Sequence, residues 1–447
     1  MFSTVFCYVR VLRHVNFERP EFNLTLYLVI ISNLTHQRAY PPMDPIRRQA
    51  ALTLALVFKC QMTMLLMWGM LSQHYLRIRQ QRQRQRRQQR LQENHQPHDQ
   101  PVVIYERHVW SLEGSGWSDA ECVEYLRFTR VQIAQLIIHL QIERFAQLRH
   151  SCRYTVSAEQ ALCMLLYRLA SPSRLQDMVL VFRVSRSYIS SITNTLVDYL
   201  YGLFKEKLLW DHKRLTLQKL KQYAKAIEKS TGVVNIWGFI DGTVRPIARP
   251  MAEQYSGNTG SYGMKFQSIV TPDGLISSLY GPEIVPKEDR ILWTECGLEP
   301  ILRTLFESNL VSNSSDSRML YLYGSPAYVP SVGIMGPFQQ KPGQMLSPVE
   351  HTTNAMMASA GVVVEWAFDI VVKLFSFSQW KQNQKLTVTP VDTYYAISVL
   401  LFNCHTILRR GNQISEHFKS LCPPPSSLAE YLNSMLSLTS YELSFCN

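Results

Sequence analysis

The sequence predicts an α/β protein in which an all-α domain precedes a mixed domain of strands and helices. From about residue 109 to 230 the apolar residues recur with the period of amphipathic helices. After Gly232 they gather into short runs bounded by turn residues, which is typical of buried strands. We therefore expect four parts: an N-terminal region (1–108), a helical domain (109–230), a mixed domain (231–412) and a C-terminal tail (413–447).

The composition supports a folded protein with a polyanionic partner. Of 447 residues, 46% are apolar and 11% aromatic, which is enough for a packed core and excludes a disordered or collagen-like chain. The formal net charge of +12 favours nucleic acid as the partner. Nine cysteines without a C-x-x-C pair argue against a zinc knuckle or a disulfide framework, so reduced thiols are expected.

The positive charge is concentrated in an arginine–glutamine segment, residues 74–91, that contains no acidic residue. A solvated low-complexity linker explains this composition. A nuclear import signal or a phosphate-binding arm explains it equally well, and the two interpretations are compatible. Under the second interpretation the candidate DNA contacts are Arg82, Arg84, Arg86 and Arg87.

An apolar segment, residues 50–71, precedes the arginines and is long enough for a membrane span. However, Lys59 and Gln61 lie at its centre, and a central lysine costs about 2.5–3.5 kcal/mol on insertion scales. An amphipathic or buried helix is therefore favoured over a membrane anchor. Met43 offers an alternative translation start just before this segment.

The helical domain contains the spacing of a helix-turn-helix between residues 157 and 204. Ser157 to Gln160 resembles a capping box and opens a helix that ends near Ala170. A short helix and a tight turn follow, and then a helix that begins with small polar and basic residues. An ordinary helical hairpin has the same spacing, so the sequence leaves both interpretations open. In a helix-turn-helix, the second helix would present these residues to a DNA groove: Arg186, Ser187, Tyr188 and Ser190.

The sequence of the mixed domain predicts four strands and two helices. The expected strands are residues 233–240, 265–271, 275–281 and 319–324, with a turn at Pro272 to Gly274, and the expected helices are 289–307 and 354–375. Three antiparallel strands, a helix, a fourth strand and a later helix match the order of an RNase H-like fold.

Two acidic residues of this domain suggest a metal site. A carboxylate at the end of a buried strand is costly unless it is hydrogen-bonded or faces a cation, and Asp241 is placed in this way. Glu365 is expected to be hemmed in by the apolar run 362–368. Either residue alone could be structural. Together they could hold Mg²⁺, which prefers oxygen ligands and promotes in-line attack on a phosphodiester.

These motifs together carry a family resemblance. The segment from about Ile236 to Asn412 resembles the DDE-type nuclease domain of PIF/Harbinger transposases and of the nucleases derived from them. The resemblance rests on these sequence motifs: Ile240-Asp-Gly-Thr243, Lys265-Phe-Gln-Ser-Ile-Val-Thr-Pro-Asp-Gly-Leu-Ile276, Leu279-Tyr-Gly-Pro282, Tyr323-Gly-Ser-Pro-Ala-Tyr328, Asn354-x-x-Met357, Val364-Glu-Trp-x-Phe368 and Asn403-Cys-His-Thr406.

The resemblance implies three catalytic and metal-binding acids, Asp241, Asp289 and Glu365, and a divalent cation, Mg²⁺ or Mn²⁺. It also implies DNA as the substrate, a separate Myb/SANT-like protein as partner and a nuclear location. Several positions depart from the family pattern, and two of them are expected to affect the metal site. Ser325 stands where the family usually has an aspartate, and Gly361 stands where it has an arginine.

Two functions therefore remain open. One is a metal-dependent DNA endonuclease of the Harbinger transposase-derived type, with activity impaired at Ser325 and Gly361. The other is a catalytically inactive, domesticated or decayed copy that still binds DNA. A third hypothesis, a membrane-tethered protein, rests on residues 50–71. The expected location is the nucleus, with the cytoplasm or a membrane as alternatives, and a homo-oligomer is compatible with all three.

Overall fold

The computed structural model describes residues 110–147, 154–248, 255–256, 261–285, 287–311, 319–328, 330–340, 343, 345–384 and 390–432. The chain divides into two compact units, Met1–Ile104 and Tyr105–Asn447. All described residues belong to the second unit. The apolar segment 50–71 and the arginine segment 74–91 lie outside the described residues, so the hypotheses about them stay predictions.

The first part of the described chain is helical, as the apolar period predicts. Side chains of Ser118, Thr129 and Thr216 accept hydrogen bonds from amides of the first turn of the helices that they precede, which satisfies donors without a helical partner. The helices are α4 (Leu112–Ser115), α5 (Asp119–Leu126), α6 (Arg130–His139), α7 (Ile142–Gln147), α8 (Ala158–Ala170), α9 (Leu175–Phe182), α10 (Arg186–Leu209) and α11 (Leu217–Thr231).

Helices α8, α9 and α10 lie where the sequence predicts helices. Ser157 caps α8 by accepting a hydrogen bond from the amide of Gln160. Arg183 has a left-handed backbone (φ 53°) that ends α9, and Ser185 caps α10 two residues later. Only three residues therefore separate α9 from α10, and α10 extends past the predicted end to Leu209.

The sheet has the predicted strand order. Its strands are β1 (Ile236–Pro246), β2 (Tyr255–Ser256), β3 (Ser261–Val270), β4 (Ile276–Ile284), β5 (Tyr321–Gly324) and β6 (Ile334–Met335). β1, β3 and β4 pair antiparallel, whereas β5 runs parallel to β1 and β6 parallel to β5. The order across the sheet is therefore β4-β3-β1-β5-β6, with the short β2 also paired to β3.

Several predicted elements differ from the structure, and the short strands β2 and β6 were not predicted. β1 does not end at Asp241, because its pairing with β3 continues to Pro246 opposite Gly263. The helix expected at 289–307 is two helices, α12 (Asp289–Glu295) and α13 (Leu298–Val311), because Gly297 adopts a left-handed backbone (φ 72°) between them. The long helix also divides, into α14 (Pro348–Gly361) and α15 (Val363–Leu374).

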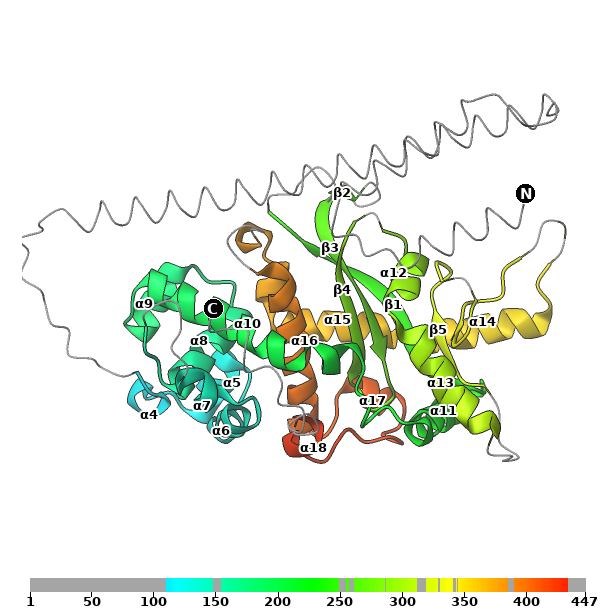
Figure 1. The fold of residues 1–447 in the computed structure, drawn as a ribbon, viewed down its shortest axis with the longest axis horizontal. Helices are drawn as coiled ribbons and strands as arrows, with labels where there is room; N and C mark the ends of the chain where they lie inside the picture. The colour runs from blue at the N-terminus through cyan, green and yellow to red at the C-terminus, as the bar shows by residue number, and fades with distance from the viewer. Residues whose placement is uncertain are drawn as a thin grey trace, which may run out of the picture. The chain divides into compact units, whose positions relative to one another are not determined.

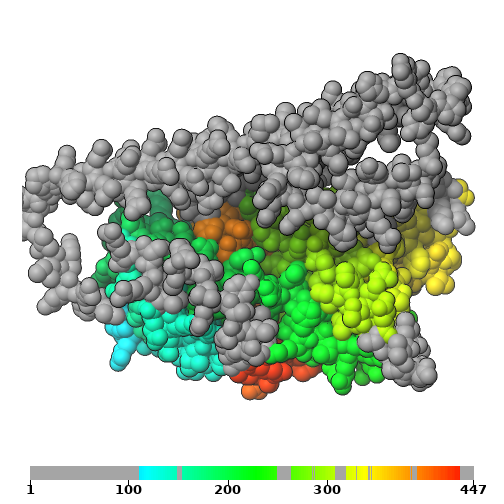
Figure 2. Space-filling view, in the orientation of Figure 1, coloured from blue at the N-terminus to red at the C-terminus, as the bar shows by residue number. Residues whose placement is uncertain are grey.

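Helices cover the sheet on two faces. On one face Phe239 and Val270 pack with apolar residues of α10, α15 and α16 (Val391–Leu408). On the other, Ile240 and Ile269 pack with apolar residues of α11, α12 and α13. Figure 1 shows α10 and α16 beside β4. Figure 2 shows the helical residues, cyan, at one end of the viewed face and α14, yellow, at the other.

Among the described residues, one helical stretch is long and apolar enough to cross a membrane by length and composition, Pro348–Leu374. It comprises α14 and α15. Val363, Val364 and Ala367 of this stretch are buried in the same core cluster as Phe239 of β1. Packing against the sheet accounts for their apolar character.

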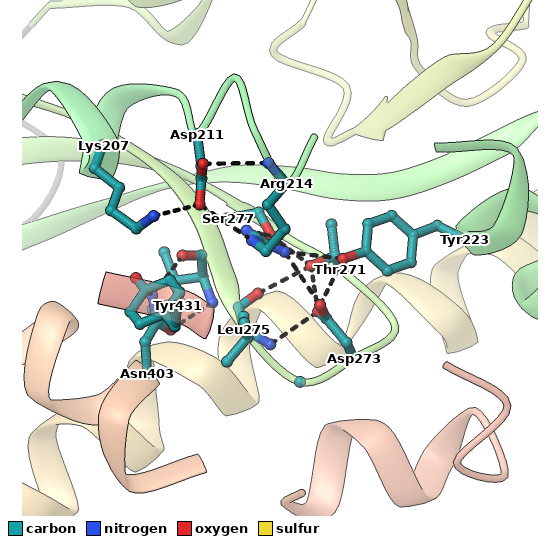
Figure 3. Close-up of polar contacts among 12 residues, drawn as sticks. Lys207, Asp211, Arg214, Tyr223, Thr271, Asp273, Leu275, Ser277, Asn403 and Tyr431 are labelled. Atoms are coloured by element: carbon teal, nitrogen blue, oxygen red, sulfur yellow. Dashed lines mark hydrogen bonds and ion pairs between the residues drawn. The ribbon is translucent and has the colours of Figure 1, made fainter. Parts of the chain in front are cut away.

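A buried polar network joins the connection between α10 and α11 to the turn that precedes β4 (Figure 3). The fully buried carboxylate of Asp273 accepts hydrogen bonds from the Tyr223 hydroxyl (2.5 Å) and the Thr271 hydroxyl (2.6 Å). The Arg214 guanidinium lies 3.1 Å from the same carboxylate and donates to the Ser277 hydroxyl. Burial raises the pKa of the Tyr223 phenol well above its usual value, so the phenol remains a donor to Asp273.

The described part of the C-terminal tail, up to residue 432, belongs to the folded core. The amide of Asn403 on α16 hydrogen-bonds both the N–H (3.0 Å) and the C=O (2.9 Å) of Ile276 at the start of β4. It also donates to the Tyr431 hydroxyl at 2.9 Å, which ties the last described helix to α16. The final helices are α17 (Gln413–His417) and α18 (Leu428–Leu432), and the short 3-10 turns Ser376–Gln379 and Lys381–Asn383 follow α15.

Candidate active site

Asp241 lies in the middle of β1, between two neighbouring strands. It pairs with Ser268 of β3, while Ile240 pairs with Gly324 of β5. Burial raises the pKa of the Asp241 carboxyl, whereas a hydrogen bond from the Gly242 backbone opposes this shift. The carboxylate is thus held in a partly desolvated position where a cation would stabilise it.

Glu365 lies in the first turn of α15, which packs against β1 and β3. Its side chain is exposed rather than hemmed in by apolar neighbours, so that expectation is wrong. The apolar residues Val364 and Phe368 on either side of it point into the core and leave the carboxylate outside. Its negative charge nevertheless repels that of Asp241 and so contributes to the raised pKa of the Asp241 carboxyl.

Asp289 opens α12 and forms an ion pair with Lys265 of β3, the two charged atoms being 2.9 Å apart. Its charge also raises the pKa of Asp241, more strongly than that of Glu365. The charges of Asp289 and Glu365 thus both act on Asp241, although the three predicted acids come from a strand and two separate helices.

The approach of Asp289 to β1 depends on Gly242. A Cβ at this position would collide with the Asp289 carboxylate and lie 3.0 Å from the side chain of Lys265. Side chains alternate between the two faces of a strand. Asp289 therefore lies over the face of β1 opposite to the one on which the side chain of Asp241 projects.

Ser325 directly follows β5, next to Asp241 in the sheet, because Gly324 pairs with Ile240. Its side chain is half-buried, and its carbonyl accepts a hydrogen bond from the amide of Tyr328 (3.0 Å). The family resemblance implies an aspartate at this position. A serine hydroxyl supplies a neutral oxygen there instead.

Gly361 is the last residue of α14 and is half-buried. A Cβ added there would meet only Phe239, at 3.7 Å, so the backbone leaves room for a side chain. Val362 keeps a helical backbone between the two helices (φ −56°, ψ −19°), which preserves the approximate one-turn spacing from Gly361 to Glu365. The backbone at Gly361 therefore does not itself exclude a residue with a side chain.

Sequence reasoning assigns no role to three polar residues of this domain: Lys265, Tyr328 and Arg245. The Tyr328 hydroxyl lies 3.3 Å from Gln267; burial, together with the charges of Asp289 and Asp241, raises its pKa well above the usual value. Arg245 is 7% exposed, and two of its guanidinium nitrogens have no hydrogen-bond partner. Lys265 and Tyr328 belong to the motifs of the family resemblance, but only the fold shows that they lie near Asp289.

The acids fit a divalent cation held largely by water. Within the described part of the chain, no group of three or more His, Cys, Asp or Glu side chains is arranged to hold a metal. Asp241 and Glu365 nevertheless repel one another, and a cation would relieve this repulsion. Mg²⁺ is commonly bound through one or two carboxylates, with waters and substrate phosphates completing its shell, and this donor set suits it.

The comparison with protein families agrees with this site. Residues 240–403 match the DDE superfamily endonuclease. The matched segment contains Asp241, Asp289, Ser325 and Glu365. It supports a DDE-type, transposase-derived nuclease domain built on the sheet from β1 to α16. No curated protein and no solved structure matches the chain.

The endonuclease match does not include the helical residues before Ile240. At the start of α10, Arg186 and Ser187 are exposed and Ser190 is half-buried. The Tyr188 hydroxyl donates a hydrogen bond to the Thr155 carbonyl (2.7 Å), so this tyrosine helps to hold the chain before α8 against α10. The other predicted DNA contacts, Arg82, Arg84, Arg86 and Arg87, lie outside the described residues.

Proposed function

We propose that this protein is a metal-dependent DNA endonuclease of the Harbinger transposase-derived type. The observation that supports it best is that the charges of Asp289 and Glu365 both raise the pKa of the partly buried Asp241 carboxyl, within the segment that matches the DDE superfamily endonuclease. Two further negative charges around a partly buried carboxylate are costly in a folded protein unless a cation binds there. Sites of this kind are therefore typically functional.

In this proposal Asp241, in the middle of β1, and Glu365, on α15, hold a Mg²⁺ or Mn²⁺ ion, and the phosphodiester of DNA is the substrate. The cation supplies Lewis acidity and lowers the pKa of bound water. Asp241 is fixed by its strand and therefore sets the position of the site. Glu365 is exposed on α15, so DNA in solution can approach its carboxylate.

The test is Mn²⁺ binding by calorimetry, followed by cleavage of plasmid DNA. We expect Asp241→Asn and Glu365→Gln each to weaken Mn²⁺ binding at least tenfold and to abolish cleavage. Asp369→Asn is the matched control, because this acid is exposed on the same helix, one turn after Glu365. Unchanged Mn²⁺ binding in Asp241→Asn would refute the proposed metal site.

A second candidate function, an inactive DNA-binding derivative, is favoured by Ser325. A neutral hydroxyl beside Asp241 leaves the site with one acid fewer than the family pattern. The variant Ser325→Asp restores that carboxylate. Tight Mn²⁺ binding by Ser325→Asp together with none by the wild type would favour the inactive derivative. Micromolar binding by the wild type would favour the nuclease.

Both functions require contact with DNA, which we assign to α9 and α10 as a helix-turn-helix. The three-residue connection between them and the exposed Arg186 and Ser187 support this assignment. Ser190 and the arginine segment are further candidates, whereas Tyr188 would contribute through its ring edge, since its hydroxyl is engaged.

Arg186→Gln tests this assignment. Loss of one phosphate contact should lower the slope of log affinity against log salt by about 1. Arg303→Gln is the control, because Arg303 is an exposed arginine of α13 that pairs with Glu299. Equal salt slopes for both variants would remove α10 from the DNA interface.

Location and partners follow from the same proposal. The arginine segment 74–91 favours nuclear import, and a Myb/SANT-like protein is the partner that the family resemblance implies. Fractionation of cells expressing the full chain separates the nucleus from the cytoplasm and from a membrane location through residues 50–71. Recovery in the membrane fraction would contradict the nuclear assignment.

A further inference from the structure

The side chain of Ser268 lies directly beside that of Asp241 in the sheet. Asp241 of β1 pairs with Ser268 of β3 in the antiparallel register. Residues that face each other in this way project on the same face of the sheet, with their Cβ atoms about 4.5–5.5 Å apart. Ser268 therefore shares the face of Asp241, opposite to the face over which Asp289 lies.

The two polar side chains interrupt an otherwise apolar part of this face. Asp241 follows Phe239 by two positions on β1, and Ser268 lies between Phe266 and Val270 on the same face of β3. The three apolar residues belong to the same core cluster as buried residues of α15. Packing alone favours an apolar residue at position 268, so the hydroxyl requires another explanation.

The hydroxyl of Ser268 is buried and has no partner. The residue is 0% exposed, and its Oγ atom forms no hydrogen bond with any described residue. A hydroxyl that leaves water without gaining a hydrogen bond costs free energy, and nearly all buried polar groups have a partner in the protein or in bound water. An unpartnered hydroxyl beside a carboxylate therefore indicates a ligand that both groups serve.

The helix that bears Glu365 covers the same place. α15 packs against both β1 and β3, and the charge of Glu365 acts on Asp241. The Ser268 hydroxyl thus lies on the face of the sheet from which Asp241 and α15 supply the two carboxylates of the candidate metal site. A serine oxygen has two lone pairs that can accept hydrogen bonds from water.

We propose that Ser268 is a further residue of the metal site, whose hydroxyl accepts a hydrogen bond from a water molecule of the bound ion. This inference rests on the proposed nuclease function, in which Asp241 and Glu365 hold the ion. Mg²⁺ retains several of its waters, and a divalent cation makes its waters more acidic and hence stronger hydrogen-bond donors. Ser268 is a positioning residue, because it acts on the ion through a water and does not ligate it.

The experiment measures Mn²⁺ binding to the full chain by calorimetry. Ser268→Ala should weaken Mn²⁺ binding about tenfold, the usual effect of removing a group that supports a metal ligand. Without metal, its melting temperature should equal or exceed that of the wild type, because the variant no longer buries an unpartnered hydroxyl. Ser268→Cys, which fills similar space with a weak acceptor, replaces Ser268→Ala if the latter does not fold.

Two further variants complete the design. Ser230→Ala is the matched control, because this serine in the last turn of α11 also has a buried hydroxyl without a partner, and Mn²⁺ binding should not change. The double variant Asp241→Asn/Ser268→Ala should bind Mn²⁺ as weakly as Asp241→Asn alone, since the water held by Ser268 belongs to the ion on Asp241.

The outcomes separate this inference from the proposed function. If Ser268→Ala binds Mn²⁺ like the wild type while Asp241→Asn does not, the role of Ser268 is overturned and the nuclease proposal stands. The role of Ser268 is also overturned if Ser268→Ala melts at a lower temperature without metal, because the hydroxyl then serves the fold. If Asp241→Asn has no effect on Mn²⁺ binding, the proposed function itself fails.

Discussion

At the scale of single residues, the candidate site depends on how closely charged groups approach one another. Gly242 is the clearest case, because its lack of a side chain allows Asp289 to lie against β1. The sequence motif around Asp241 predicts an acidic residue on a strand. It does not predict that the next residue must be small for a carboxylate on a distant helix to fit.

Gly242→Ala should therefore destabilise the protein by about 1–3 kcal/mol, the usual cost of inserting an extra methyl into a packed site. Thermal or urea unfolding measures this change. Gly202→Ala on α10 is the control, since a Cβ there meets nothing within 4 Å and alanine favours a helix. The cost should largely vanish in Gly242→Ala/Asp289→Ala, and an equal loss in that double variant would contradict the steric explanation.

The raised pKa of Asp241 predicts a pH dependence of stability. The folded state binds this proton more tightly than the unfolded state, so stability falls as pH rises from the ordinary value of 3.8 through the raised pKa. Without metal, Asp241→Asn should melt a few degrees higher than the wild type near neutral pH. This difference should shrink toward pH 4 and reverse in saturating Mn²⁺, which stabilises only the wild type. A melting difference independent of pH would contradict the prediction.

At the scale of helices and strands, the periodic patterns predict which elements form, and tertiary pairing decides where they end. The strand order was predictable because buried strands, turns and helices alternate distinctly from residue 233 to 375. The extension of β1 to Pro246 was not, because it depends on pairing with β3. The exposure of Glu365 was missed for a similar reason: its apolar neighbours face the sheet, and a linear run does not show direction.

The buried network around Asp273 joins the connection between α10 and α11 to the turn that precedes β4. No sequence pattern predicts this link. Asp273→Asn should destabilise the protein by about 3–5 kcal/mol, because Arg214 would remain buried without its counter-charge. Urea unfolding measures this loss. Glu299→Gln is the matched control: its ion pair with Arg303 is exposed, and its removal should cost less than about 1 kcal/mol. Similar losses in both variants would show that burial does not strengthen the ion pair of Asp273.

At the scale of the whole molecule, the unit Tyr105–Asn447 contains the entire candidate site. The arginine segment belongs to the other unit, Met1–Ile104. Metal binding and long-range attraction to DNA are therefore assigned to different parts of the chain. The sequence predicts both features, and the fold places the three acids in the second unit.

A chain that starts at residue 105 should bind Mn²⁺ like the full-length protein and bind DNA with a weaker salt dependence. Each arginine that no longer contacts a phosphate lowers the slope of log affinity against log salt by about 0.9. Fluorescence anisotropy with a labelled duplex at several salt concentrations measures this slope. Identical slopes for the two chains would show that residues 82–87 do not touch DNA.

The side chain of Asn403 has a consequence for the border strand of the sheet. β4 borders the sheet, and a border strand offers unpaired peptide groups to any extended segment of another molecule. Asn403 presents one acceptor and one donor to Ile276, as a neighbouring peptide unit would. An amide on a helix thus completes the hydrogen bonding of the sheet at this point. Because α10 and α16 cover β4, replacing Asn403 with leucine would leave the N–H and C=O of Ile276 buried without this partner, which should destabilise the protein.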